Sequence, residues 1–322
     1  VLVGRQGSRR WVTTVSADGA GGPAGGGAGG AGGADLGLEV AAGEIELPDG
    51  FNLSSPISHR EWKALVANAV RRISQGDLAK VVLARKVEVE ANRPFVVADV
   101  VSRLISLYPS CTIFSVDGLV GASPELLVRR QGDLVTCLPL AGTVARSGDT
   151  ASDEALIAGL LASAKQRGEH RFVVETLADQ LGPLCSELEV PSTPIVIGLR
   201  NVSHLASPIR GRLAGPGPLP TALELAALLH PTPAVGGVPR EAALSYLLTS
   251  EKLDRGRYAG PVGWVDAHGD GAFAVAIRCA EVHGNRATLF AGSGVVEGSE
   301  PGAELAESQL KLQALLAALV RP

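Results

Sequence analysis

The order of hydrophobic and polar positions divides the chain into helices and short strands. Apolar residues recur at the helical period over 58–76, 97–108, 154–182, 221–229, 240–249 and 301–319. Alternating or β-branched runs predict strands over 9–15, 79–90, 111–116, 126–130, 134–138, 193–202, 204–213, 260–266, 272–282 and 286–295. The last three strands form a meander that leads into the C-terminal helix. Strands come in hairpins with helices between the groups, which predicts an α+β fold with antiparallel sheet.

A glycine-rich stretch over 18–35 separates the first strand from the rest of the chain. It cannot bury enough apolar surface to offset its ordering entropy, so we expect a flexible surface loop or an artificial join. A phosphate-binding loop is excluded, because no Lys-Ser or Lys-Thr pair follows the glycines. The division expected is therefore 1–57, a strand and a flexible segment, and 58–322, the main domain.

Composition narrows the class of protein. The formal net charge of −4 over 322 residues predicts neither a nucleic-acid surface nor a polybasic membrane anchor. No apolar run is long enough to span a bilayer and no signal peptide is visible, although the first residue is Val1 and the start could be trimmed. The four cysteines lie among apolar neighbours without metal-ligand spacing, which indicates reduced core residues of a cytoplasmic protein.

Several charged residues occupy positions that burial would make reactive. Lys80 shares a strand face with Val82 and Ala84, so it is either a desolvated base or a strand-end lysine that reaches water. Glu125 precedes an apolar run; it is either a carboxyl kept protonated as a general acid or an ordinary loop residue. Glu169 falls on an apolar helix face and needs a metal or a basic partner there.

Other candidates lie near the C-terminus. Arg278 is a cation in an apolar strand and must face a carboxylate of the protein or of a ligand. Glu304, Glu307 and Lys311 share one helix face, where they could hold a divalent cation and an anionic ligand or form a solvated surface. His204 is ambiguous, since a lone histidine is more often structural than catalytic.

Nine motifs, taken in order, resemble the chorismate-utilising enzymes, the family of isochorismate, salicylate, anthranilate and aminodeoxychorismate synthases. The resemblance runs from Ser58 to Lys311. The motifs are KVVLAR, GASPELL, PLAGT, EH at 169–170, HPTPAVGG, DRGRYAGPVGW, AIRCAEV, FAGSGVV and ELAESQLK. It implies two antiparallel sheets packed together with helices outside and a buried site between them, so that 58–322 would be a chorismate-binding catalytic domain.

The resemblance also implies roles. Lys80 matches the base that activates water, and Glu125 matches the acid that protonates the departing hydroxyl. Glu169 and Glu307 match ligands of Mg²⁺, with Glu304 nearby in the metal shell. The positions that match substrate-binding or pocket-lining groups are Gly142, Thr143, His204, Ala234, Tyr258, Arg278, Gly292 and Lys311.

Two positions and one loop favour an isochorismate synthase within the family. Ammonia-using members have a Gln at the position of Lys80, and aminodeoxychorismate synthases have a nucleophilic Lys at the position of Ala141. The loop HPTPAVGG is similar to that of isochorismate synthases. A salicylate synthase, which also eliminates pyruvate, and a non-catalytic chorismate-binding paralogue are the alternatives. The family's habit implies a monomer that binds chorismate, and the product could feed siderophore, menaquinone or salicylate synthesis.

Overall fold

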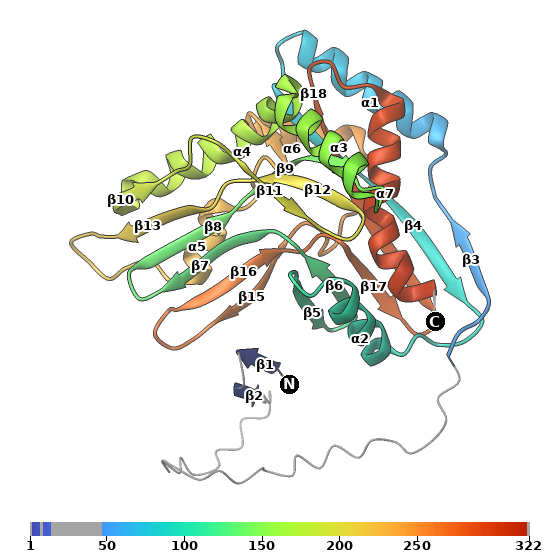
Figure 1. Cartoon of the computed structure of the whole chain (residues 1–322), viewed down its shortest axis with the longest axis horizontal. Coiled ribbons are helices and arrows are strands. Elements are labelled where there is room, and N and C mark those ends of the chain that lie inside the picture. Colours follow the sequence, from blue (N-terminus) through green and yellow to red (C-terminus); the bar gives the residue numbers. More distant parts are fainter. Residues whose placement is uncertain (1, 7–8, 14–46, 321–322) are drawn as a thin grey trace. The chain divides into compact units, whose positions relative to one another are not determined.

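The computed structural model describes residues 2–6, 9–13 and 47–320, which form two separate units (Figure 1). The small unit contains an antiparallel hairpin of β1 (Leu2–Gln6) and β2 (Arg9–Thr13). The strand predicted over 9–15 is therefore confirmed over Arg9–Thr13. The glycine-rich stretch 18–35 lies outside the described residues. All other elements belong to the large unit.

The large unit contains two extensive antiparallel sheets and a smaller one. The seven-stranded sheet has the order β14-β4-β18-β17-β6-β5, with β3 also paired to β4. Its strands are β3 (Phe51–Ser54), β4 (Lys80–Ala91), β5 (Thr112–Val116), β6 (Leu119–Ser123), β14 (Gly237–Val238), β17 (Cys279–His283) and β18 (Arg286–Val296). The six-stranded sheet has the order β10-β13-β8-β7-β16-β15, and the three-stranded sheet the order β11-β12-β9.

The strands of the six-stranded and the three-stranded sheets come mostly from the middle of the chain. Those of the six-stranded sheet are β7 (Leu126–Gln131), β8 (Leu134–Leu138), β10 (Cys185–Glu189), β13 (Ile209–Leu213), β15 (Pro261–Val265) and β16 (Gly271–Val275). Those of the three-stranded sheet are β9 (Leu140–Ala145), β11 (Ile195–Gly198) and β12 (Val202–Ala206). All the pairings are antiparallel, which confirms the predicted α+β class.

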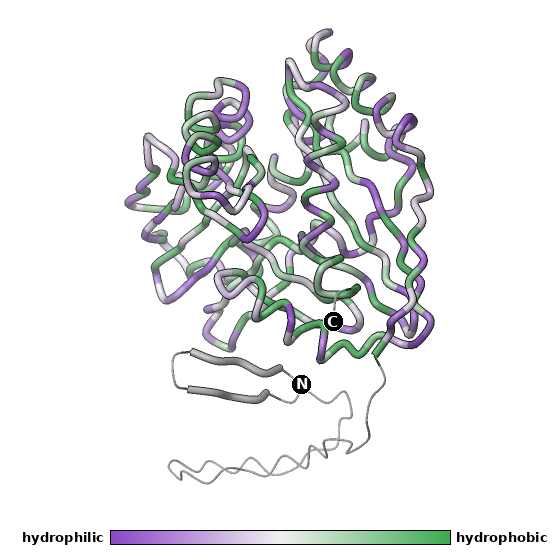
Figure 2. Tube along the Cα trace, turned by 45° about the vertical axis from the view of Figure 1, so that its right-hand side comes forward, coloured by the Kyte–Doolittle hydropathy of each residue, from purple (hydrophilic) through white to green (hydrophobic). Residues whose placement is uncertain are grey.

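Seven helices pack on these sheets. They are α1 (His59–Ser74), α2 (Val97–Leu107), α3 (Thr150–Ala162), α4 (Ala164–Leu181), α5 (Ala222–Leu229), α6 (Arg240–Ser250) and α7 (Pro301–Val320). Ser58 caps α1 with a full capping box, and the buried face of that helix repeats every three or four residues from Trp62 to Ile73. Figure 2 shows the alternation of hydrophilic and hydrophobic residues along it. None of the helices described is long and apolar enough to cross a membrane.

The core has one apolar cluster between the two large sheets and two on the far side of the seven-stranded sheet. The first joins Ala84 and Phe290 of the seven-stranded sheet to Val128 of the six-stranded sheet. The second cluster packs α2 and α7 against the opposite face of the seven-stranded sheet. The third packs α1, α6 and α7 against that face. Because β4 alternates, Val82 and Ala84 face the space between the sheets, while Leu83 faces the helices.

Three sequence-based predictions need correction. The helix expected over 154–182 is two helices, because Ser163 ends α3 and its hydroxyl caps α4 by accepting from the Gln166 amide. The strands expected over 193–202 and 204–213 are three strands, β11, β12 and β13, with breaks at 199–201 and 207–208. Periodicity alone does not show these interruptions, since both flanking segments keep their apolar faces.

The C-terminal meander is also not continuous. The strand expected over 272–282 is split, since β16 belongs to the six-stranded sheet and β17 to the seven-stranded sheet. The chain crosses between the sheets at 276–278, and Arg278 has a φ of +51° in the left-handed region that non-glycine residues rarely adopt. Arg278 therefore lies at the crossing point, not within a strand.

Candidate active site

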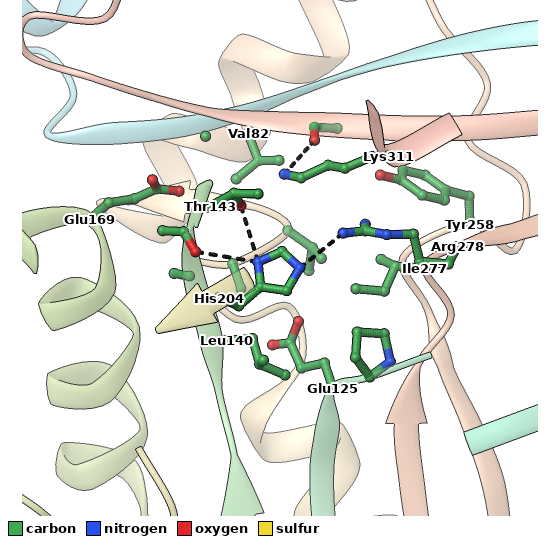
Figure 3. A pocket seen from close by; sticks show the side chains of 17 residues that line it. Val82, Glu125, Leu140, Thr143, Glu169, His204, Tyr258, Ile277, Arg278 and Lys311 are labelled. Atoms are coloured by element: carbon green, nitrogen blue, oxygen red, sulfur yellow. Dashed lines mark hydrogen bonds between the residues drawn. The ribbon is translucent and has the colours of Figure 1, made fainter. Parts of the chain in front are cut away.

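A cavity between the seven-stranded and the three-stranded sheets collects most of the residues singled out from the sequence (Figure 3). Strands β4, β9, β12 and β18, helices α4 and α7, and the loops after β6, α5 and β16 supply its walls. The predicted site residues that line it are Glu125, Gly142, Thr143, Glu169, His204, Ala234, Tyr258, Arg278, Gly292 and Lys311. Lys80 and Glu307 contact Glu169 and Lys311 of its wall, and Glu304 lies behind them against Ser293.

Lys80 begins β4 and is completely buried. Its Nζ lies 3.2 Å from Oε1 of Glu169, on α4. The snorkelling alternative is therefore wrong, since the ammonium does not reach solvent. Burial raises the pKa of Glu169; Lys80 opposes this rise, and the charge of Glu307 adds to it. Gly294 makes room for this pair, because a Cβ there would lie 2.0 Å from the Glu169 Oε1.

Glu125 lies between β6 and β7, and its carboxyl points into the cavity below His204 (Figure 3). Its backbone amide donates to the Ser123 hydroxyl, which fixes the turn, and only 3% of the residue is exposed. Burial raises its pKa to about 7, and the positive charges of Lys80, Arg278 and Lys311 limit the rise. Both the protonated and the ionised forms are therefore populated near neutral pH, as a general acid requires.

The His204 ring lies between Arg278 and strand β9. Its Nε2 lies 3.1 Å from Arg278 Nη2, and its Nδ1 lies 3.1 Å from Thr143 Oγ1 and 3.3 Å from Gly142 O. A guanidinium only donates, so Nε2 must accept and Nδ1 carries the proton. Burial, Arg278 and Lys311 hold the pKa of His204 well below its ordinary value. The imidazole is thus neutral and orients the Arg278 guanidinium.

Lys311 and Arg278 are the basic residues that line the cavity. Lys311 Nζ donates to Gly292 O at 3.0 Å and to Glu307 Oε1 at 2.6 Å. Tyr258 stacks on Phe290 with ring centroids 5.2 Å apart, and a Cβ at position 292 would lie 2.9 Å from the tyrosine oxygen. Gly292 therefore lets the tyrosine hydroxyl approach β18, next to the carbonyl that Lys311 binds.

Two carboxylates of α7 meet at a buried serine. The Ser293 hydroxyl lies 2.5 Å from Glu304 Oε2 and 3.2 Å from Glu307 Oε1. Lys165 Nζ lies 2.6 Å from Glu304 Oε1. The single hydroxyl hydrogen of Ser293 can serve only one of the two carboxylates, and Glu307 Oε1 also accepts from Lys311 Nζ. A shared cation would satisfy both groups.

The described residues do not contain a group of three or more His, Cys, Asp or Glu side chains that could hold a metal ion in their present positions. The oxygen donors near the cavity do match the chemistry of Mg²⁺, which binds carboxylates and keeps part of its water shell. Each carboxylate instead faces an ammonium: Glu169 faces Lys80, Glu304 faces Lys165 and Glu307 faces Lys311. The three glutamates are oxygen donors of the kind that Mg²⁺ prefers, so the donor set suits this metal.

Sequence reasoning missed two polar residues here. Ser293 is completely buried and bonds to both α7 carboxylates, and its position between two glycines of an apolar strand was the available signal. Lys165 precedes Gln166 at the start of α4, and nothing in the local pattern distinguishes it from a surface lysine. Apolar cavity residues such as Val82, Leu140 and Ile277 cannot be told from ordinary core residues in the sequence.

Known proteins with similar sequences are chorismate enzymes. Residues 44–320 match the sequence profile described as chorismate binding enzyme. The isochorismate synthase DhbC of Bacillus subtilis (strain 168) is 41% identical over 270 residues, which are 80% of this chain and 67% of that protein. The salicylate biosynthesis isochorismate synthase of Pseudomonas aeruginosa is 44% identical over 274 residues, which are 83% of this chain and 56% of that protein.

Solved structures agree with this similarity. The structure of MenF, the menaquinone-specific isochorismate synthase from Escherichia coli, superposes with a TM-score of 0.75 and 32% identity. The superposition covers 84% of this chain and 63% of the MenF chain. The chain thus spans little more than half to two thirds of the length of these proteins, and the part that matches contains the whole cavity.

Proposed function

The chain belongs to the chorismate-binding enzyme family, and from this we propose that it is an isochorismate synthase, which isomerises chorismate to isochorismate. The observation that carries the proposal is the pairing of a completely buried lysine with a carboxyl of pKa about 7 at one cavity. Exchange of one allylic hydroxyl for another needs such a pair, a base for the entering water and an acid for the departing hydroxyl.

The cationic side of the cavity would receive the substrate. Chorismate carries two carboxylates, and Arg278 and Lys311 supply basic hydrogen-bond donors at the cavity wall. The His204 ring holds the guanidinium in place at 3.1 Å, and Tyr258 adds a hydroxyl beside Gly292. Binding by these groups fixes the ring of the substrate so that its C2 and C4 positions face the reacting side chains.

The reaction then requires one proton to leave water and one to reach the C4 hydroxyl. Lys80 takes the proton from the water that adds at C2, the ring double bonds shift, and Glu125 protonates the C4 hydroxyl as it leaves as water. Lys80 accepts that proton through the lone pair of its amine, and the Glu169 carboxylate, 3.2 Å from Nζ, holds the side chain in position.

A divalent metal ion fits beside these groups. Glu169 and Glu307 would hold Mg²⁺, with Glu304 next to it, and the bound ion would supply positive charge for a carboxylate of chorismate. Gly294 supports this assignment, because its missing side chain lets the Glu169 carboxylate lie directly on β18.

The replacement Lys80→Gln tests the proposal. Glutamine keeps a polar group but cannot take a proton from water, so we expect isochorismate formation to fall by about a hundredfold or more. Chorismate should still raise the melting temperature of the variant, because Arg278 and Lys311 are unchanged. Turnover of Lys80→Gln at close to the native rate would contradict the assigned base. Pyruvate release that matches chorismate loss in the native enzyme would indicate a salicylate synthase.

A further inference from the structure

The strand that carries Lys80 has an incomplete neighbour on one side. β14 pairs with β4 only at Lys80 and Val81. The next amide, that of Val82, donates to Gly236 O at 2.8 Å. The next strand on that edge of β4 is β3, which pairs only from Glu88 to Ala91, so Val82 O and Ala84 N lie in a gap between two strands and need other partners.

Two side chains supply those partners. Arg255 Nη2 donates to Val82 O at 2.7 Å, and the Ala84 amide donates to Glu251 Oε1. Arg255 Nη1 donates to Val235 O at 2.9 Å, in the loop after α5. One guanidinium therefore ties the backbone of β4 to the backbone of the cavity-wall loop.

The two side chains also hold each other. Arg255 Nε lies 2.7 Å from Glu251 Oε2, and its Nη2 lies 2.8 Å from Glu251 Oε1, which is a two-pronged ion pair. Only 3% of the Glu251 side chain and 19% of the Arg255 side chain are exposed. Burial disfavours the charge of Arg255, but Glu251 outweighs this and the pKa of Arg255 is raised. The pair is thus mostly buried, and salt screens it less than it screens a surface pair.

The backbone groups that this pair binds belong to cavity residues. Val82 and Val235 both line the cavity, and Ala234 lies beside Val235. Lys80 is two residues from Val82 on the same strand face. The position of the Lys80 ammonium relative to the opposite cavity wall therefore depends on how firmly the loop and the strand are joined here.

We propose that Glu251 and Arg255 are positioning residues for the reaction, which fill the gap between β14 and β3 on this edge and set the spacing between the Lys80 strand and the loop at 234–235. The proposal rests on the function proposed above. It explains why both ends of the ion pair bond to backbone: the strand edge presents one carbonyl and one amide, which require one donor and one acceptor.

The variants Arg255→Lys and Glu251→Gln test this. Lysine keeps the charge but cannot reach two carbonyls and the carboxylate with one planar group, so kcat should fall and KM for chorismate should rise, each about tenfold. Hydrogen exchange at the Ala84 amide should be faster in Glu251→Gln, while the β18 amides opposite it stay protected. A merely structural role would reduce the folded fraction, which lowers apparent kcat and leaves KM unchanged.

The matched control is the exposed i,i+4 pair of Arg171 and Glu175 on α4, whose closest atoms are 3.6 Å apart. Arg171→Lys and Glu175→Gln should leave KM, kcat and exchange unchanged. Native KM together with native Ala84 exchange in both Glu251→Gln and Arg255→Lys would overturn the proposal. If the native enzyme does not convert chorismate, the proposed function fails, and the exchange of Ala84 still decides whether the pair holds the strand.

Discussion

Replacing Glu125 with glutamine should make the protein more stable and less active, and the size of the gain should depend on pH. The pKa of this carboxyl rises from 4.5 to about 7 because the side chain is buried. A rise of that size corresponds to about 3 kcal/mol of destabilisation at pH values well above 7, where the folded protein must keep a buried charge.

The sign follows from proton binding. Between pH 4.5 and about 7 the folded state holds this proton and the unfolded state releases it, so stability falls as the pH rises through this range. Below pH 4.5 both states are protonated and the contribution vanishes. Glutamine is neutral throughout, so the stability difference between Glu125→Gln and the native protein should be about 2 kcal/mol larger at pH 8.5 than at pH 5.5.

Denaturant unfolding of both proteins at the two pH values measures this difference, and chromatography of the chorismate reaction gives the activity. The variant should lose about a hundredfold or more in rate, because an amide cannot give a proton to the leaving hydroxyl. Glu154→Gln, at an exposed position of α3, is the matched control and should show no such pH dependence. A stability difference that is the same at both pH values would refute the buried-acid account.

Three further changes probe other parts of the site. Arg278→Lys should raise KM for chorismate by about tenfold, since lysine cannot bind a carboxylate with two parallel hydrogen bonds; an unchanged KM in steady-state kinetics would remove Arg278 from the substrate site. Glu307→Gln should weaken Mg²⁺ binding, measured by titration calorimetry, by about tenfold or more, while the unfolding midpoint without metal stays within a few degrees of native. Native affinity for Mg²⁺ would exclude Glu307 as a ligand of the metal. Gly294→Ala should abolish most activity, because its Cβ would lie 2.0 Å from the Glu169 carboxylate. The control Gly302→Ala places its Cβ with no atom within 4 Å and should keep native activity. Equal activities of the two variants would show that Glu169 can move without loss of activity.

The fold class and the candidate residues could be predicted because they depend on local patterns. Alternation placed Lys80, Val82 and Ala84 on one face of β4, and the structure confirms that this face is turned to the space between the sheets. The helix face of Glu304, Glu307 and Lys311 was also visible from spacing. The burial of Lys80 was not, since local sequence favoured a lysine that reaches water and only packing with α4 covers it.

The features that were missed depend on contacts between distant segments. The chain crosses between the sheets at Arg278, and the flanking residues on both sides are equally apolar, so the pattern shows one long strand. Likewise, Glu251 and Arg255 form an ordinary i,i+4 pair in sequence; that they bond to β4 and to Val235 depends on where α6 ends against the sheet.

The central claim is tested most directly by the products of the native protein with chorismate and Mg²⁺, followed by NMR or chromatography until no further change occurs. Because one allylic hydroxyl replaces another, we expect a stable mixture of chorismate and isochorismate that has the same composition when the reaction starts from isochorismate. EDTA should stop the conversion in both directions. Release of pyruvate in step with the loss of chorismate, or failure of either compound to form the other, would contradict the account.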